Sequence, residues 1–383
     1  SKGDCMKKIM IVFGTRPEAI KLAPVIQVLK KEKSFETIVC STGQHREMLQ
    51  QVLEIFDLRI DDDLDLMKPN QTLFDITSNS LIRLKDSIEK YQPDILMVQG
   101  DTTTAFTSAL AAFYKQIKIA HVEAGLRSYD VLHPYPEEAN RRFISVISDF
   151  NFVPTEDSKQ NLLREGFSSE SIFVTGNTVV DALLQIKNKL DDPKYSLQIK
   201  TDIESKLGSD IFSKKYILIT LHRREKFGDE MKDLLYTLEA LAERYPEYNF
   251  IYPVHLNPNV VNPVRDILSR TKNFILTEPM DYLNFLYMMS RCHFIMSDSG
   301  GVQEECFVFS KPIIVMRGVT ERNEAVKAGY AFLTGSDRKL INECFTDIDK
   351  KQSQNFNFFP KQNPFGDGKA SEKILEILKQ KLL

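Results

Sequence analysis

A Ser-Gly-Gly turn is the most specific chemical signal in the sequence. Ser299, Gly300 and Gly301 follow an apolar run, Phe294–Met296, and open a stretch with helical spacing. Glycine lets the backbone approach a phosphate closely, and the free amides of a first helical turn donate to it. The Ser299 hydroxyl adds a donor, and Glu305, further along, can accept from ribose hydroxyls. The pattern predicts a site for a phosphorylated nucleoside.

A second anion-binding corner follows the first apolar run, Ile9–Phe13. Thr15 is suited to cap the next helix, and Pro17 suits its first turn. Arg16 and Lys21 add positive charge at that helix end. The same residues are as typical of an ordinary helix cap with solvated charges. The chain contains neither GxGxxG nor GxxxxGK[ST], which disfavours NAD sites and Walker-type ATP sites.

Acidic side chains after further apolar runs are the candidates for proton transfer. Asp101 follows one run, and His121 and Glu123 leave the next. Glu137 opens another helical stretch, four residues before Arg141 and on the same face. Carboxyl groups and imidazole are common general acids and bases. The structural alternatives are a helix cap for Asp101, an ion pair within the loop for Glu123, and a surface ion pair for Glu137.

Histidine and cysteine spacing argue against a metal centre and against disulfides. The 6 histidines form no HxH or HxxxH pair, although His222 and His255 each follow an apolar run. The 5 cysteines are far apart and include no CxxC, as in proteins that keep their thiols reduced. The absence of a GxSxG elbow disfavours a serine hydrolase. We therefore expect no metal and a cytoplasmic location.

Short apolar runs alternate with helical patterns along the chain. Such runs occur at residues 9–13, 37–40, 94–98, 117–120, 216–219, 250–252, 274–276, 294–296 and 312–315. Continuous β-branched runs are typical of strands covered on both faces, and strand–helix alternation predicts parallel sheets. The expected fold class is α/β, with two doubly wound domains that face each other. In such sheets ligands bind beyond the carboxyl ends of the strands, where the candidate residues fall.

The boundary between the two domains falls in a polar region. Residues 185–213 lack a strand pattern, and a new strand–helix series begins at Tyr216. We place a hinge near 170–185. The first domain is expected to span 1–175 and to be completed by a C-terminal helix at 369–383, and the second to span 176–368.

Composition excludes several classes of protein. The 383 residues carry 50 Lys and Arg against 53 Asp and Glu, a net charge of -3. A nucleic-acid binder usually shows a basic excess, so no nucleic-acid partner is expected. No apolar run reaches ~18 residues, and the N-terminus SKGDC lacks an apolar signal core. We therefore expect neither a membrane-spanning helix nor a secretory signal.

Taken together, these segments resemble the non-hydrolysing UDP-N-acetylglucosamine 2-epimerases over residues 6–383. The ordered motifs that carry the resemblance are Phe13–Lys21, Gln44–Glu47, Gly100–Thr104, His121–Arg127, Pro136–Arg141, Gly176–Thr178, His222–Glu225, Ser297–Glu305 and Thr320–Arg322. Each motif alone is weak, but the ordered series is specific. The resemblance implies two Rossmann-like doubly wound domains facing a deep cleft, the arrangement of GT-B glycosyltransferases. It also implies no cofactor and a homodimer.

The reaction implied by the resemblance inverts C2 of UDP-GlcNAc to give UDP-ManNAc. A base removes the C2 proton while the bond from C1 to UDP breaks, which leaves 2-acetamidoglucal and UDP. UDP then adds back, with protonation on the other face. The partners are UDP-GlcNAc, UDP-ManNAc and UDP, and the product serves bacterial surface polysaccharides.

Matching motif positions imply residue roles. The catalytic candidates are Asp101, Glu123, Glu137 and His222. The substrate-binding candidates are Arg16, Lys21, Arg141, Ser299, Gly300, Gly301, Glu305 and Arg322. Lys21 and Arg141 are expected to orient the carboxylates and to keep them ionised. Some members bind a second UDP-GlcNAc as activator, at positions matched here by Gln44, Glu137, Arg223 and His255, whereas Glu47 and Asn70 depart from that site.

Three other functions remain open. A glycosyltransferase with the same cleft needs an acceptor and does not exchange the C2 proton of its donor. A hydrolysing epimerase releases free ManNAc and UDP. A nucleotide-sugar sensor binds UDP-GlcNAc without turnover.

Overall fold

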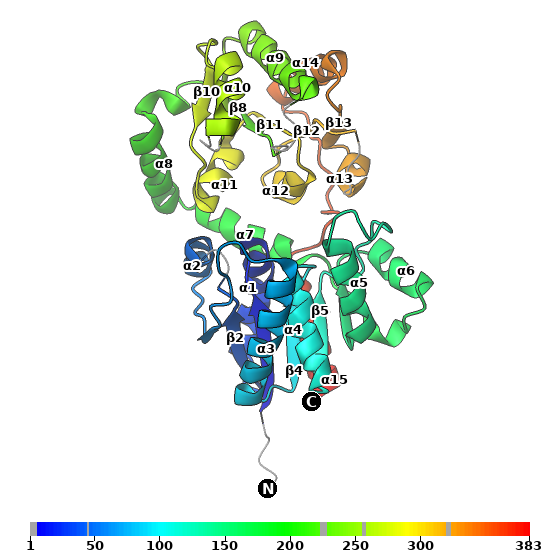
Figure 1. Cartoon of the computed structure of the whole chain (residues 1–383). Helices are drawn as coiled ribbons and strands as arrows, with labels where there is room; N and C mark the ends of the chain where they lie inside the picture. Colours follow the sequence, from blue (N-terminus) through cyan, green and yellow to red (C-terminus); the bar gives the residue numbers. More distant parts are fainter. Residues whose placement is uncertain (1–5, 44–45, 223–227, 255–257, 319–322) are drawn as a thin grey trace. The chain divides into compact units, whose positions relative to one another are not determined.

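The computed structural model describes residues 6–383 apart from 44–45, 223–227, 255–257 and 319–322. The chain forms two compact units (Figure 1). The first unit runs up to Leu184 and is completed by Phe365–Leu383, and the second is Gln185–Pro364. The chain leaves the first unit within helix α7 (Thr178–Asp191), after the boundary expected at 175, because the first half of this helix still belongs to the first unit.

The first unit is built on a seven-stranded parallel sheet with the order β3-β2-β1-β4-β5-β6-β7. Its strands are β1 (Lys7–Phe13), β2 (Phe35–Ser41), β3 (Asp62–Asp63), β4 (Ile95–Gln99), β5 (Lys118–Val122), β6 (Phe150–Val153) and β7 (Ile172–Val174). The strand order reverses between β1 and β4. In doubly wound sheets this switch point marks the crevice in which ligands bind.

Helices cover this sheet, and threonines cap several of them. They are α1 (Arg16–Lys31), α2 (Arg46–Ile55), α3 (Leu73–Tyr91), α4 (Thr103–Tyr114), α5 (Glu137–Ile147), α6 (Glu156–Arg164), the short η1 (Ser169–Ser171) and the C-terminal α15 (Ala370–Leu382). The caps are Thr15, Thr72, Thr102 and Thr155. Helix α15 packs against α1, so the end of the chain returns to the first unit.

The second unit has a six-stranded parallel sheet with the order β10-β9-β8-β11-β12-β13. Its strands are β8 (Tyr216–Thr220), β9 (Asn249–Pro253), β10 (Phe274–Thr277), β11 (Phe294–Ser297), β12 (Ile313–Val315) and β13 (Ala331–Leu333). Its helices are α8 (Pro193–Leu207), η2 (Ser209–Phe212), α9 (Asp229–Arg244), α10 (Pro258–Leu268), α11 (Tyr282–Arg291), η3 (Gly300–Val302), α12 (Gln303–Val308), α13 (Asn323–Ala328) and α14 (Arg338–Ser353). This strand order is that of the Rossmann fold.

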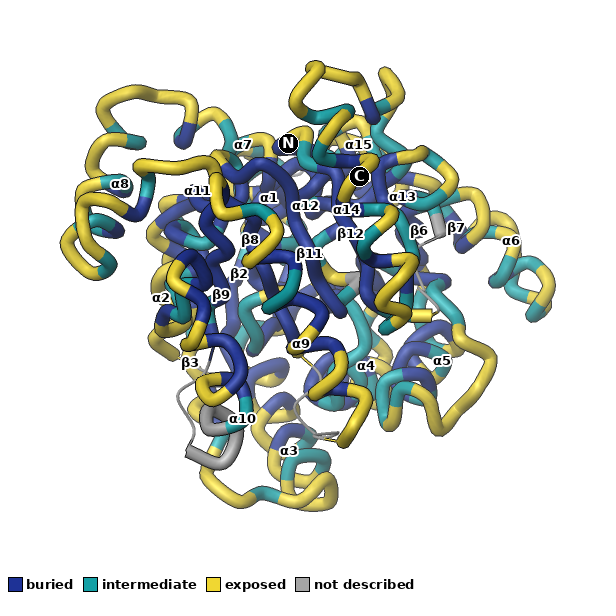
Figure 2. The backbone as a smooth tube through the Cα atoms, turned by 90° about the horizontal axis from the view of Figure 1, so that it is seen from above, coloured by how far each residue is buried: buried dark blue, intermediate teal, exposed yellow. Residues whose placement is uncertain are grey.

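Burial on both faces explains the apolar runs of the sequence. Ile217–Ile219, Phe294–Met296 and Ile313–Val315 are all 0% exposed. In Figure 2 strands β8 and β11 are buried, whereas α8 and α9 carry exposed surface. The predicted fold class of two parallel, doubly wound α/β units is therefore confirmed. Among the described residues, no helix combines the length and the apolar character needed to cross a bilayer.

Candidate active site

The predicted residues of the first unit fall at the carboxyl ends of its parallel strands. Arg16 follows β1, Asp101 follows β4 and Glu123 follows β5. Because these strand ends meet at one edge of the sheet, their side chains come together. The charges of Arg141, Glu123, Glu137 and Lys21 all act on the Asp101 carboxyl. The structure thus brings Asp101 together with Glu123, Glu137, Lys21 and Arg141.

Helix α1 begins at a reciprocal cap. Thr15 accepts from the Glu18 N–H, as predicted, and the Glu18 carboxylate accepts from the Thr15 N–H at 3.0 Å and its hydroxyl at 2.7 Å. The Thr102 hydroxyl, at the start of α4, donates to the other Glu18 oxygen at 3.3 Å. Glu18 is buried, and burial raises its pKa. Glu18 therefore ties the loop that carries Arg16 to the loop that carries Asp101.

Glu123 is held by donors from three separate elements. Lys21 Nζ lies 2.9 Å and Gln99 Nε2 3.2 Å from its Oε1, while Asn177 Nδ2 lies 2.7 Å from its Oε2. The side chains of Lys21 and Glu123 are only 15% and 11% exposed. Glu123 thus forms an ion pair with Lys21 of α1, and the alternative of an ion pair within its own loop is wrong. Glu123 is an oriented carboxylate at the edge of the sheet.

Asp101 carries the clearest sign of a reactive carboxyl group. The N-cap of α4 is Thr102, whose hydroxyl accepts from the Ala105 N–H at 3.0 Å, so the helix-cap alternative for Asp101 is wrong. Burial raises the pKa of Asp101 to about 6, although Arg141 Nη1 lies 3.5 Å from Oδ2 and opposes the rise. Arg141 therefore does not keep Asp101 firmly ionised. A carboxyl group that titrates near neutral pH is suited to proton transfer.

Arg141 is held by a buried carboxylate that the sequence did not single out. Its Nε donates to Glu138 Oε1 at 2.6 Å, and Glu138 is 0% exposed. Glu138 also accepts from the N–H groups of Ser128 and Tyr129, at 3.1 and 2.8 Å. Among the described ion pairs, Arg141 joins Glu138 and Asp101 and not the half-buried Glu137, so the predicted surface pair is wrong.

His121 is a buried neutral residue beneath these groups. Its Nε2 lies 2.7 Å from the Gly100 carbonyl oxygen, so Nε2 carries the proton and donates it. Burial lowers the pKa of His121 to about 4. His121 therefore supports the turn that leads into Asp101.

In the second unit the Ser-Gly-Gly turn follows β11, as predicted. The Ser299 N–H donates to Ser297 Oγ at 3.0 Å, and the Gly301 N–H donates to Ser299 Oγ at 3.1 Å. The turn continues as η3 from Gly300 and leads into α12, whose first turn contains Glu305. Ser299 can still donate its hydroxyl proton to an anion.

Asp298 joins this turn to the neighbouring loop. It is 2% exposed, and its Oδ1 accepts from the His222 N–H at 2.7 Å. Since β8 and β11 flank the switch point of this sheet, His222 and Ser299 follow the strands where a ligand is expected. The predicted Gln44, Arg223, His255 and Arg322 lie outside the described residues. In the part of the chain that the structure describes, no group of three or more His, Cys, Asp or Glu could hold a metal ion.

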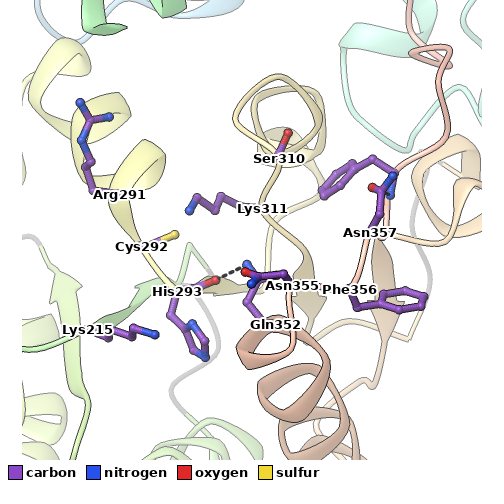
Figure 3. A pocket seen from close by; sticks show the side chains of 11 residues that line it. Lys215, Arg291, Cys292, His293, Ser310, Lys311, Gln352, Asn355, Phe356 and Asn357 are labelled. Atoms are coloured by element: carbon purple, nitrogen blue, oxygen red, sulfur yellow. Dashed lines mark hydrogen bonds between the residues drawn. The ribbon is translucent and has the colours of Figure 1, made fainter.

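A cavity of about 480 Å³ lies at the amino ends of the strands of the second unit (Figure 3). Lys215 and His293 directly precede β8 and β11, and Lys311 precedes β12. Figure 3 shows Gln352 of α14 beside the His293 carbonyl, to which it donates at 2.7 Å. Helices α11, α12 and α14 end at residues near this cavity, where cations are favourable partners for free carbonyls. No predicted site residue lines it.

The comparisons with known proteins identify the family. The family described as UDP-N-acetylglucosamine 2-epimerase matches residues 27–379. A protein of that name from Neisseria meningitidis serogroup A is 48% identical over 371 residues, covering 97% of this chain and 99% of that protein. This chain belongs to the UDP-N-acetylglucosamine 2-epimerase family. A UDP-N-acetylglucosamine 2-epimerase from Escherichia coli K12 is 45% identical over 372 residues, covering 97% of this chain and 98% of its own.

Solved structures of epimerases agree with this assignment. The Neisseria meningitidis UDP-GlcNAc 2-epimerase bound to UDP-GlcNAc matches with a TM-score of 0.87 and 47% identity, covering 97% of this chain and 100% of that one. The Methanocaldococcus jannaschii UDP-GlcNAc 2-epimerase in complex with UDP-GlcNAc and UDP matches with a TM-score of 0.80 and 34% identity. The match covers 97% of this chain and 99% of that one. A Rickettsia africae glycosyltransferase, 17% identical with a TM-score of 0.60, shares the fold alone.

Proposed function

We propose that this protein reversibly epimerises UDP-GlcNAc at C2 to UDP-ManNAc, through elimination of UDP, a 2-acetamidoglucal intermediate and re-addition of UDP. Family membership and the similarity to an epimerase solved with UDP-GlcNAc support the substrate. The observation that carries the chemistry is the placement of two unlike carboxyl groups at one sheet edge. Asp101 has its pKa raised to about 6, and Glu123 is paired with Lys21 at 2.9 Å.

Unlike carboxyl groups suit this reaction because a proton leaves one face of C2 and arrives at the other. Asp101 is present in both protonation states near neutral pH, so it can donate or accept. Glu123 beside Lys21 acts as a carboxylate base. Glu137, half-buried at the start of α5, is the third candidate, and Arg141 orients Asp101.

Departure of UDP must carry the reaction, because the C2 proton is only weakly acidic. Preorganised donors and cations stabilise the charge that develops on the leaving pyrophosphate. We assign this role to Arg16, the Ser299 hydroxyl and the amides of Gly300 and Gly301. We assign Glu305 to the ribose, and His222 and Arg322 to the phosphates. The proposed reaction needs no cofactor.

Incubation with UDP-GlcNAc in deuterated water tests this proposal. We expect UDP-ManNAc to form with deuterium at C2. Failure to find either UDP-ManNAc or deuterium exchange would overturn the proposal. Release of free ManNAc and UDP would indicate hydrolysis, and turnover only with an acceptor would indicate a glycosyltransferase.

Neutral variants test the residue roles. Asp101→Asn, Glu123→Gln and Glu137→Gln should each lower turnover by ~10²–10⁴-fold if each residue transfers a proton. UDP binding, measured by calorimetry, should persist. Glu156→Gln, on the exposed start of α6, is the matched control and should retain activity. Normal turnover in one of the three variants would remove that residue from the mechanism.

We further propose a cytoplasmic homodimer that serves surface polysaccharide synthesis. Helix α4 packs against both α3 and α5, and these helices expose Ile82, Phe113, Phe143 and Val146 by 60%, 51%, 51% and 70%. Exposed apolar side chains of this kind mark surfaces that bind another protein, and we assign a second copy of this chain as the partner. Light scattering should give the mass of a dimer for the wild type. Val146→Glu should shift the measured mass towards that of a monomer. The free thiols of Cys40, Cys292 and Cys306 suit a reducing compartment.

A further inference from the structure

Asn177 connects Glu123 to the segment in which the chain returns to the first unit. Its Nδ2 donates to Glu123 Oε2 at 2.7 Å. Its own N–H donates to the Phe365 carbonyl oxygen at 2.8 Å. Asn177 is 8% exposed, so neither bond competes strongly with water. One residue thus contacts both a candidate base and the returning chain.

The orientation of the Asn177 amide follows from its neighbours. The Val179 N–H donates to Asn177 Oδ1 at 2.9 Å, which makes that atom the oxygen. The other atom of the amide is therefore the nitrogen, and it must donate to Glu123. An aspartate at this position could accept from Val179 but could not donate to Glu123.

Among the described hydrogen bonds, Asn177 donates to a different oxygen of Glu123 from Lys21 and Gln99. Lys21 and Gln99 both donate to Oε1, at 2.9 and 3.2 Å, whereas Asn177 donates to Oε2. A carboxylate held through one oxygen can still rotate about its last bond. The bond from Asn177 fixes that rotation and so fixes which lone pair of Glu123 is available for a proton.

The returning segment approaches Asn177 closely. A Cβ added to Gly366, whose φ is +146°, would lie 3.2 Å from the Asn177 nitrogen, and a Cβ added to Gly176 would lie 3.3 Å from Gly366 Cα. Further along, Asp181 accepts from the N–H groups of Ala370 and Ser371, at 3.2 and 2.8 Å. Asp181 therefore anchors the same segment, and no described contact joins it to Glu123.

We propose that Asn177 is a positioning residue that orients the Glu123 carboxylate and links that orientation to the path of Phe365 and Gly366. The catalytic consequence rests on the proposed epimerase function, whereas the contact itself does not. One measurement therefore tests the contact, and another tests its effect on catalysis. A carboxyl titration of Glu123 reports the contact in any event, and turnover reports its consequence.

The variant Asn177→Asp tests the proposal with Asp181→Asn as its control. Asn177→Asp keeps the acceptor for Val179 and places a like charge beside Glu123, whereas Asp181→Asn loosens the returning segment only. Carboxyl ¹³C NMR, assigned with Glu123→Gln, should show the Glu123 titration raised by about 1 pH unit in Asn177→Asp and unmoved in Asp181→Asn. An unmoved titration in Asn177→Asp would overturn the proposal.

Turnover gives the second readout. We expect kcat for UDP-GlcNAc to fall by ~10–100-fold in Asn177→Asp with little change in KM, and the acidic limb of its pH profile to move with the Glu123 titration, because a base must be deprotonated to act. Asp181→Asn should keep the wild-type pH profile. Equal losses in both variants with unchanged pH profiles would show that Asn177 is merely structural. If the wild type lacked C2 exchange, the epimerase proposal would fail while the titration still decided the contact.

Discussion

Replacement of Asp101 by asparagine is predicted to stabilise the folded protein above pH 6 while it abolishes most turnover. The pKa of Asp101 rises from its ordinary value of 3.8 to about 6 on folding. The folded state therefore binds more protons than the unfolded chain between these values, so stability falls as pH rises through this window. Above pH 6 Asp101 is ionised in the folded protein, and the cost of burying this charge lowers the free energy of unfolding in full.

The size of this penalty follows from the shift. About 2 pKa units correspond to about 3 kcal/mol. The Asp101 side chain is 32% exposed, and solvent screening lowers the penalty, so we expect ~1–2 kcal/mol. An amide has nearly the shape of the protonated acid and never ionises. Asp101→Asn should therefore gain this amount at pH 8 and almost nothing at pH 4.

Urea unfolding followed by circular dichroism at pH 4, 6 and 8 measures the gain. Comparison of wild type and variant at each pH cancels the titration of all other groups. Asp157→Asn, exposed on α6, is the control and should show no gain that grows with pH. An Asp101→Asn variant that is no more stable than wild type at pH 8, or whose gain is equal at pH 4 and pH 8, would refute the reasoning.

Three further predictions concern the buried groups around the site. Glu138→Ala should lower the free energy of unfolding by ~3–5 kcal/mol in urea titrations, because Arg141 loses its buried carboxylate; a loss below ~1 kcal/mol would contradict this. Gly366→Ala should cost ~1–3 kcal/mol more than Gly166→Ala, because only Gly366 would meet a neighbouring backbone atom within 4 Å, although Gly166 also has a positive φ of +90°. His121 should stay neutral and protonated at Nε2 from pH 6 to 9 in ¹⁵N spectra, because its pKa is lowered to about 4; a titration near pH 6.5 would speak against its burial.

The fold was predictable from sequence where strands are buried on both faces. Strands such as β1 and β8 are apolar from end to end, and a continuous run signals them directly. Strand β6 was missed because Asn151 interrupts its run, although that side chain is buried. Strand β13 was missed because its three residues, Ala331–Leu333, include no β-branched side chain. The polar segment 185–213 was recognised as lacking a strand, and the structure shows it to be mostly α7 and α8.

The sequence pattern identified the candidate residues that directly follow strand ends, but not the residues that hold them in place. Residues directly after strand ends, such as Asp101 and Glu123, stand out because turns there present polar groups next to apolar runs. Lys21 was expected as a support only through the family resemblance. The residues alone do not show that Lys21 or Asn177 contacts Glu123, because these contacts join distant positions: Lys21 lies 102 residues and Asn177 54 residues from Glu123. Gln99 is the supporting residue that the sequence pattern could have indicated, because it is a polar residue at the end of the apolar strand β4, at the same sheet edge.

The supporting contacts explain why the two carboxyl groups differ. A buried carboxylate is stable only when donors replace the water that it loses. In the part of the chain that the structure describes, Glu123 accepts from Lys21, Gln99 and Asn177, and Glu138 accepts from Arg141 and two backbone amides. For Asp101, the charged partner among the described residues is Arg141 at 3.5 Å, which Glu138 holds more closely at 2.6 Å. The cost of burial is thus left uncompensated mainly at Asp101, the group whose proton must move.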